Sequence, residues 1–163
     1  MTVTTTTTPA TTGDRVEEQV LLHSPRSRVW RALTDPADFG AWFGVNLAGA
    51  TVAPGATLRG NFTIPGHEDA VFDARVEEVV PESRFSWRWH PHAIDPAADY
   101  SGEERTLVTF TLEDAADGGT LVRVVETGFD RVPAARREVA FLGNSSGWRG
   151  QLQKRLPAYL ATA

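Results

Sequence analysis

The sequence NSSGWRGQLQKRLPAYL, residues 144–160, decides the fold of this chain. Its large apolar side chains recur about every four residues, which is the spacing of one face of an amphipathic helix: Trp148, Leu152, Leu156 and the pair Tyr159 and Leu160. The segments before it have the character of strands. A long helix after antiparallel strands needs a broad sheet to lie on, and a curved sheet around one helix tends to leave a space. We therefore expect the functional site in that space.

Alternation of apolar and polar residues predicts the strands upstream of this helix. In residues 70–80, for example, Phe72, Ala74 and Val76 share one face. Residues 114–119, DAADGG, are a strong hairpin signal. Short strands joined by tight turns indicate an antiparallel sheet. The predicted strands are residues 15–23, 45–51, 56–64, 70–80, 83–90, 104–113 and 119–128.

Two short helices are expected after the first strand. Ser24 is the predicted N-cap of the first one, and Pro25 takes its first helical position. The sequence TDP at residues 34–36 ends that helix and caps a second one over residues 37–42.

The C-terminal region is predicted to contain a short helix followed by the long one. Pro133 opens the short helix, which runs to about Leu142 because Gly143 has the character of a C-terminal glycine. Residue 144 or 145 then caps the long helix. Pro157 is expected to kink or fray its last turn.

Composition and charge exclude several classes of function. The 163 residues fit one domain that is large enough to enclose a cavity. The net charge is −5, and no Lys/Arg run alternates with aromatic residues, which argues against nucleic acid as a partner. The absence of cysteine excludes disulfides, thiolate metal sites and a cysteine nucleophile, and fits a cytoplasmic location.

The first 13 residues, MTVTTTTTPATTG, have neither a basic start nor an apolar core, so they do not resemble a secretory signal. They offer nothing to pack, and we expect a disordered tail. Residues 14–163 then form a single domain. No stretch approaches the roughly 18–20 apolar residues of a membrane span, so we expect a soluble protein.

Several short motifs, taken in order, carry a family resemblance. They are SPRSRVWRALTDP (24–36), WF (42–43), FSW (85–87), GGTLVRVVETGF (118–129) and GW (147–148) with the leucine stripe after it. Together they resemble the helix-grip superfamily, also called SRPBCC or START-like, which includes START domains and the birch-pollen allergen. Within it the chain is most similar to the branch homologous to the activator of heat-shock-protein-90 ATPase.

This resemblance runs from about Arg15 to Leu160 and implies the fold. The expected architecture is α+β: a curved antiparallel sheet of about six to seven strands grips the C-terminal helix around a hydrophobic cavity. The superfamily places binders, cyclases, hydroxylase subunits and chaperone regulators on one scaffold, so the fold does not select one activity. The eukaryotic chaperone activator has an additional N-terminal domain without a counterpart here, and we rank a chaperone partner last.

The candidate ligand-binding residues are mostly aromatic, because aromatic side chains give contact area and orient flat ligands. Ordinary core packing is the alternative for each of them. Trp87 and Trp89 are also candidates for the pocket mouth. The full set is Trp42, Phe43, Phe62, Phe85, Trp87, Trp89, Phe110, Trp148, Leu152 and Glu126.

Glu126 is the candidate for chemistry. Its strand phase places it on the face of Val122 and Val124, where a carboxylate is costly unless it is paired. Burial would raise its pKa and suit it to act as an acid, a base or a ligand anchor. The alternative is a position at the sheet rim, in contact with an arginine or water.

Other polar motifs give weaker signals. The sequences HED at residues 67–69 and HPH at residues 90–92 match no metal-ligand spacing, so we expect solvated loop residues and no metal. Arg105 and Arg123 could reach a carboxylate or an anionic ligand, or lie on a solvated outer face. Nucleophile-elbow, phosphate-loop and dinucleotide motifs are absent from the sequence, and we expect no cofactor.

Three functions remain open. The first is a pocket protein, a monomer or a homodimer, that binds a small hydrophobic or aromatic molecule. The second is an enzyme similar to polyketide cyclases and aromatases, with Glu126 as its acid or base. The third is an interaction module similar to the chaperone activator, which predicts an exposed apolar or charged patch.

Overall fold

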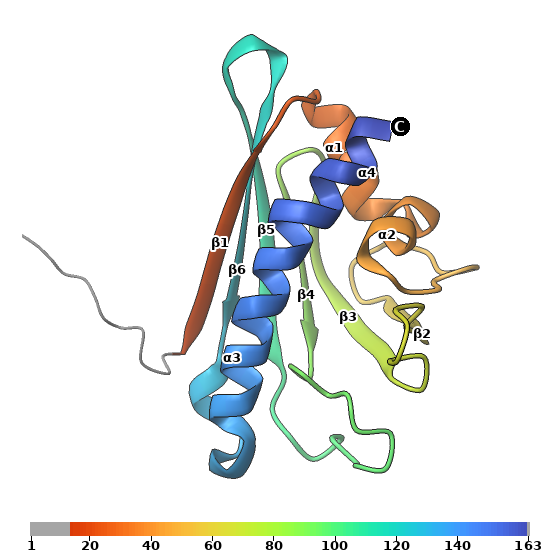
Figure 1. Ribbon diagram of the computed structural model, residues 1–163, viewed down its shortest axis with the longest axis vertical. Helices are drawn as coiled ribbons and strands as arrows, with labels where there is room; N and C mark the ends of the chain where they lie inside the picture. The colour runs from red at the N-terminus through yellow and green to blue at the C-terminus, as the bar shows by residue number, and fades with distance from the viewer. Residues whose placement is uncertain (1–13, 163) are drawn as a thin grey trace, which may run out of the picture.

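In the computed structural model, which describes residues 14–162, a curved antiparallel sheet lies against a long C-terminal helix (Figure 1). The sheet order is β1-β6-β5-β4-β3-β2, and the predicted helix-grip architecture is confirmed. The predicted tail, residues 1–13, lies outside the described residues. The strands are β1 (Arg15–Leu22), β2 (Thr57–Asn61), β3 (Val71–Val80), β4 (Arg84–Trp89), β5 (Thr106–Asp114) and β6 (Thr120–Thr127).

Strands β5 and β6 show the clearest alternation, as their sequences predict. Every second residue is buried on the face that meets the helix. Their register places Phe110 beside Val124 and Val108 beside Glu126, so the carboxyl group lies among apolar neighbours. This face supports the site.

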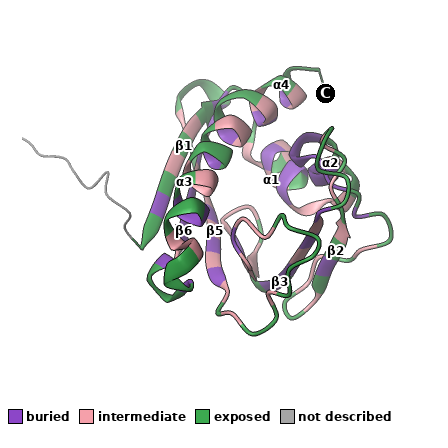
Figure 2. Ribbon diagram, turned by 60° about the horizontal axis from the view of Figure 1, so that its bottom comes forward, coloured by how far each residue is buried: buried purple, intermediate pink, exposed green. Residues whose placement is uncertain are grey.

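Two short helices, α1 (Arg26–Thr34) and α2 (Pro36–Phe43), cover one end of the sheet (Figure 2). The second begins as predicted, because Oδ1 of Asp35 accepts hydrogen bonds from the backbone N–H groups of residues 37 and 38. The prediction that Ser24 caps α1 is wrong. Pro25 occupies the N-cap without a side-chain hydrogen bond, and the Ser24 carbonyl accepts a hydrogen bond from Thr120 Oγ1 at 2.7 Å.

The strand predicted over residues 45–51 is also wrong. Only Val45 bridges to Phe62, and the chain then turns. Asn46 Oδ1 accepts a hydrogen bond from Ala48 N at 3.0 Å, a local bond that competes with strand pairing. The strand predicted over residues 56–64 shortens to β2.

The C-terminal helix is longer than predicted. It runs through α3 (Ala134–Gly150), a π-helical turn η4 (Gln151–Arg155) and α4 (Leu156–Thr162), so the predicted stop at Gly143 is wrong. The stripe of Trp148, Leu152, Leu156 and Leu160 is buried as expected.

Gly143 serves close packing instead. A Cβ atom there would lie 2.6 Å from Nδ1 of His92, so only glycine lets that ring approach the helix. The irregular turn η4 lies just before Pro157, which lacks an N–H donor and crowds the preceding turn. Within residues 14–162 no helix is long and apolar enough to cross a membrane.

Candidate ligand-binding site

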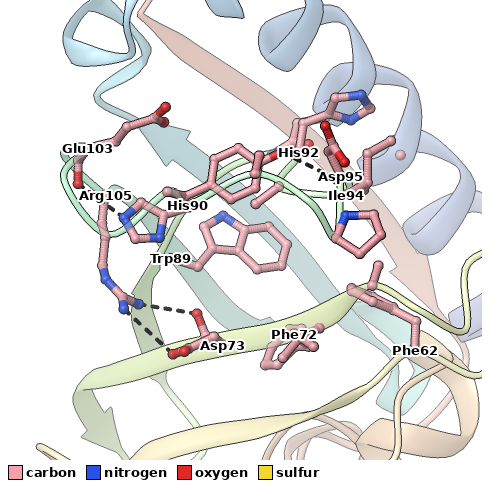
Figure 3. Close-up of a pocket in the computed structure, with 18 of the residues that line it drawn as sticks. Phe62, Phe72, Asp73, Trp89, His90, His92, Ile94, Asp95, Glu103 and Arg105 are labelled. Carbon is pink, nitrogen blue, oxygen red and sulfur yellow. Dashed lines mark hydrogen bonds and ion pairs between the residues drawn. The ribbon is translucent and has the colours of Figure 1, made fainter.

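A pocket of about 580 Å³ lies between β2, β3, the β4–β5 loop and α3 (Figure 3). This volume is within the usual range for small-molecule sites, roughly 300–1,000 Å³. The pocket is partly open to solvent, and its wall has an aromatic part and a polar part. We call the aromatic part the floor and the polar part the rim.

The floor consists of Phe43, Phe62, Phe72, Trp89 and Trp148, which come from both the sheet and the helices. Ring centroids are 5.5 Å apart for Phe72 and Trp89, and 5.9 Å apart for Trp89 and Trp148. These distances are typical of aromatic pairs that contribute to packing. The floor is therefore one contiguous surface.

The Glu126 carboxyl lies behind the floor and is completely buried. Oε2 accepts hydrogen bonds from Trp89 Nε1 at 2.8 Å and from Thr106 Oγ1 at 2.6 Å. Oε1 accepts one from Trp148 Nε1 at 2.8 Å, and Asn144 Nδ2 donates to both oxygens at 2.9 and 3.1 Å. The donors belong to β4, β5 and α3, so one carboxyl group joins the sheet to the helix.

Burial raises the pKa of the Glu126 carboxyl, and the hydrogen bonds from Thr106, Trp148, Trp89 and Asn144 oppose this rise. Indole and amide N–H groups can only donate, so an acceptor must stand opposite them. The predicted position of Glu126 on the inner face is confirmed, and of the two alternatives left open there the carboxyl takes the buried one and not the rim position with an arginine or water.

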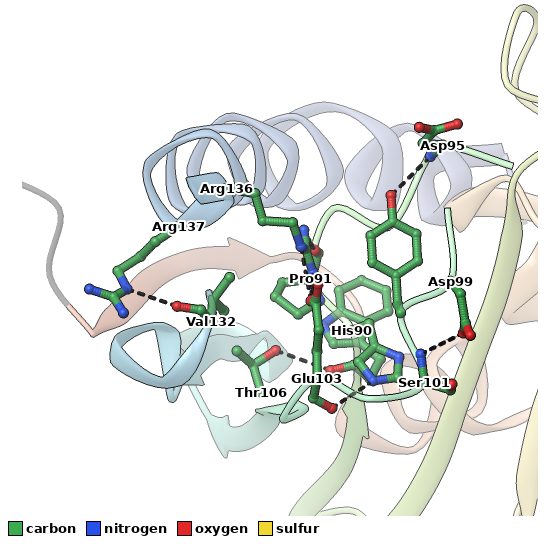
Figure 4. A network of polar contacts seen from close by, with 12 residues as sticks. His90, Pro91, Asp95, Asp99, Ser101, Glu103, Thr106, Val132, Arg136 and Arg137 are labelled. Carbon is green, nitrogen blue, oxygen red and sulfur yellow. Dashed lines mark hydrogen bonds and ion pairs between the residues drawn. The ribbon is translucent and has the colours of Figure 1, made fainter. Parts of the chain in front are cut away.

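The β4–β5 loop, residues 90–105, forms most of the rim and is fastened to α3 (Figure 4). Arg136 of α3 donates to Glu103 Oε1 at 2.7 and 2.9 Å. Its guanidinium also lies 4.7 Å from the centre of the Tyr100 ring. Nε2 of His90 hydrogen-bonds the Glu103 carbonyl at 3.0 Å. The loop is therefore an ordered wall.

The histidines of this loop differ from the expectation of solvated side chains. His90 and His92 are both half-buried, whereas His67 is exposed. Burial is the main cause that lowers the pKa of His90 and of His92, and the nearby positive charge of Arg136 lowers both further. Within residues 14–162 no group of three or more His, Cys, Asp or Glu side chains is placed to hold a metal ion.

Two arginines of the pocket wall share one aspartate. Arg59 lies 2.5 Å from an oxygen of Asp73, and Arg105 lies 3.6 Å from the other oxygen. Arg105 thus reaches a carboxylate, as one of its two predictions stated. Arg123 pairs with Glu17 at 3.5 Å and does not line the pocket.

Four of the candidate ligand-binding residues line the pocket, and the others are buried in the core behind it. Trp87 is in ring contact with Phe39 at 5.7 Å and Phe110 at 5.4 Å, so the region beside α2 is filled. The expected space under the helix is therefore confined to the loop side. Phe43, Phe62, Trp89 and Trp148 line it, while Trp42, Phe85, Trp87, Phe110, Glu126 and Leu152 do not.

The sequence reasoning missed Phe72, Asn144 and Gln151 as lining residues. Asn144 precedes Trp148 by one helical turn, and this spacing could have placed both on one face. The alternation over residues 70–80 places Phe72 on one face of the strand with Ala74 and Val76, but it does not indicate a role in ligand binding. Gln151 begins the π-helical turn, and no sequence pattern marks where that turn starts.

Comparison with known families gives one clear match. The family model described as "Activator of Hsp90 ATPase homolog 1-like protein" matches residues 23–161. No curated protein matches the chain.

Solved structures with the same fold include proteins of several bacteria. DynU16, a protein of the dynemicin biosynthetic locus, has a TM-score of 0.68 and 27% identity over 92% of this chain and 48% of its own. The present chain therefore spans about half the length of DynU16. Protein MLL2253 from Mesorhizobium loti has a TM-score of 0.68 and 28% identity over 91% and 98% of the two chains. CalU16 from Micromonospora echinospora, at 20% identity, a TM-score of 0.59 and 90% and 73% coverage, is similar in fold alone.

Proposed function

We propose a ligand-binding function for this chain, which belongs to the family of Activator of Hsp90 ATPase homolog 1-like proteins. It acts as one domain that holds a small, flat, apolar molecule against the floor of the pocket. The main support is the floor itself, where Trp89 and Trp148 direct their N–H groups to Glu126 and leave ring carbon atoms to line the pocket. Apolar burial supplies the affinity, at about 25 cal/mol per Å².

The floor is formed before any ligand arrives. Neither Trp89 nor Trp148 can rotate without breaking a buried hydrogen bond to Glu126. A ligand therefore does not have to order these side chains, and the entropic cost of binding is smaller than it would be for a site with mobile side chains. Preorganisation of this kind supports binding of rigid, planar molecules over flexible chains.

The two alternative functions have less support. A cyclase-like reaction would use Glu126 as an acid or a base, but its carboxyl already has four protein donors and is not among the lining residues. A chaperone partner is suggested only by the family's description. The large apolar side chains that are exposed within residues 14–162 do not add support for it; they are Leu21, Ile94, Val139 and Leu142.

Two glycines of α3 provide a direct test. Gly147 lines the pocket, and a Cβ atom there would meet no atom within 4 Å. Gly150 is equally open but does not line the pocket, which makes it a matched control. Native mass spectrometry with a library of flat apolar molecules should find ligands for the wild type and for Gly150→Trp, and these should be lost in Gly147→Trp.

The control separates blocking of the pocket from damage to the helix. Both variants should keep the far-UV circular dichroism of the wild type. If Gly147→Trp retains every ligand, or if no flat apolar molecule binds the wild type, the proposed function is wrong.

A further inference from the structure

The hydrogen-bond donors of the pocket floor and of the adjoining helix face are already engaged by the protein. The indole N–H groups of Trp89 and Trp148 and the amide N–H₂ of Asn144 all donate to Glu126. Nε2 of Gln151 donates to the backbone carbonyl at the end of α2 at 3.0 Å. A ligand that needs donors from this part of the wall would have to break these bonds.

The acceptors of the same wall are free. Oε1 of Gln151 is buried and has no hydrogen-bond partner within residues 14–162. The Asn144 amide turns its nitrogen to Glu126, and its oxygen makes no hydrogen bond to the described part of the chain. Reversing either amide would place oxygen against oxygen, so the network fixes their orientation. The interior of the pocket therefore offers acceptors.

The charges of the rim favour the same kind of ligand as the free acceptors do, because negative groups outnumber positive ones. Five carboxylates line the pocket, against two guanidinium groups. Both guanidinium groups lie on one of these carboxylates, that of Asp73, and a second one, Glu103, is paired with Arg136. The remaining three, Asp69, Asp95 and Asp99, have no ion-pair partner within residues 14–162.

We propose that the pocket selects molecules that join a flat apolar body to a protonated amine. This inference rests on the proposed ligand-binding function and adds the charge and the hydrogen-bonding sense of the ligand. An ammonium group carries several donors and no acceptor, which matches Gln151 Oε1, Asn144 Oδ1 and the rim carboxylates. The indole faces of the floor also attract a cation. A carboxylate ligand offers only acceptors and a negative charge, so these oxygen atoms and the rim carboxylates disfavour it.

Three probes with one ring system test the inference: naphthylethylamine, naphthylethanol and naphthylacetate. At pH 7 they are cationic, neutral and anionic. Isothermal titration with the wild-type protein should give an affinity for the amine about tenfold above that for the alcohol, since one charge-assisted hydrogen bond is worth roughly this factor. The acetate should bind most weakly. Added salt should weaken binding of the amine alone.

A pair of double variants locates the selecting charges. Asp95→Asn with Asp99→Asn removes two rim charges and keeps the acceptor oxygens of their loop turns. It should lower the affinity for the amine about threefold to tenfold and leave the alcohol unchanged. Glu113→Gln with Asp130→Asn removes two exposed carboxylates that do not line the pocket, and it should change neither affinity.

The outcomes distinguish this inference from the proposed function. Equal affinities for amine and alcohol, or an acetate that binds most tightly, overturn the selection of amines while ligand binding stands. Equal effects of the two double variants also overturn it. If none of the three probes binds, both proposals fail for this ring system.

Discussion

Strand β4 passes through two regions that contain the same kinds of side chain. In one region these side chains fill a closed core, and in the other they line an open pocket. Phe85 and Trp87 are completely buried in a closed region, where Trp30 of α1 and Phe39 of α2 pack on them. Trp89, two residues further on the same face, is half-buried in the pocket floor. The difference lies in what covers them. Helices bring rings that fill the space, whereas the loop of residues 90–105 brings polar side chains that leave it open.

The largest expected effect concerns the Glu126 carboxyl, which lies behind the pocket floor. Glu126→Ala removes the acceptor of four donors, and each buried donor without a partner costs about 1–3 kcal/mol. We expect a loss of about 4 kcal/mol or more in the free energy of unfolding, measured with urea.

Glu126→Gln is the matched control, because it keeps the shape and one acceptor oxygen. It should lose less, about 1–3 kcal/mol. If Glu126→Ala costs less than about 1 kcal/mol, the hydrogen-bond network does not hold the helix to the sheet.

A pair of phenylalanines compares the two regions directly. Phe85→Ala in the closed region should cost about 3–5 kcal/mol of stability and leave ligand affinity unchanged. Phe62→Ala in the half-buried floor should cost only about 1 kcal/mol but weaken binding of a flat ligand. Urea denaturation and titration of each variant measure both quantities. Equal stability losses would remove the distinction between the regions.

The pH dependence should come from the open region. Because the pKa values of His90 and His92 are lowered by burial, the unfolded chain takes up protons first on acidification. The free energy of unfolding should therefore fall as the pH drops below about 6.5, the ordinary histidine value. The raised pKa of Glu126 acts in the opposite sense, since its protonation on acidification favours the folded state.

The variant His92→Asn separates these contributions. The difference in stability between the wild type and His92→Asn should shift in favour of the variant as the pH falls from 7 to about 5. Parallel pH curves for the two proteins would mean that His92 does not contribute.

The smallest effect concerns two glycines of α3. Gly150→Ala should raise the free energy of unfolding by about 0.5–1 kcal/mol, because its Cβ enters open space. Gly143→Ala should gain less or lose stability, since its Cβ must displace the His92 ring from the helix. Thermal unfolding of both variants measures this. Equal gains would show that the contact with His92 is not tight.

The regular parts of this architecture could be predicted because their periods are fixed. The four-residue spacing from Trp148 to Leu160 predicted the buried face of the helix, and the alternation of β6 placed Glu126 on the inner face. The partners of Glu126 could not be derived in this way. They come from three separate elements, and only tertiary packing brings them together.

The rim could not be predicted for a related reason. Residues 90–105 have no period, and their position depends on the pairing of Glu103 with Arg136, 33 residues away. Gly143 was misinterpreted because glycine serves both to end helices and to admit a close neighbour. The sequence does not distinguish these two uses.

The shared carboxyl group behind Trp89 and Trp148 has a consequence for how relatives of this chain could diversify. Both indole rings are hydrogen-bonded to the same carboxyl group, so a change in the position of either ring disturbs the other. New ligand specificities would then arise by substitutions in the loop of residues 90–105, while Trp89 and Trp148 stay unchanged. The same coupling makes the two indoles a built-in optical reporter, whose emission should respond together when the pocket is occupied.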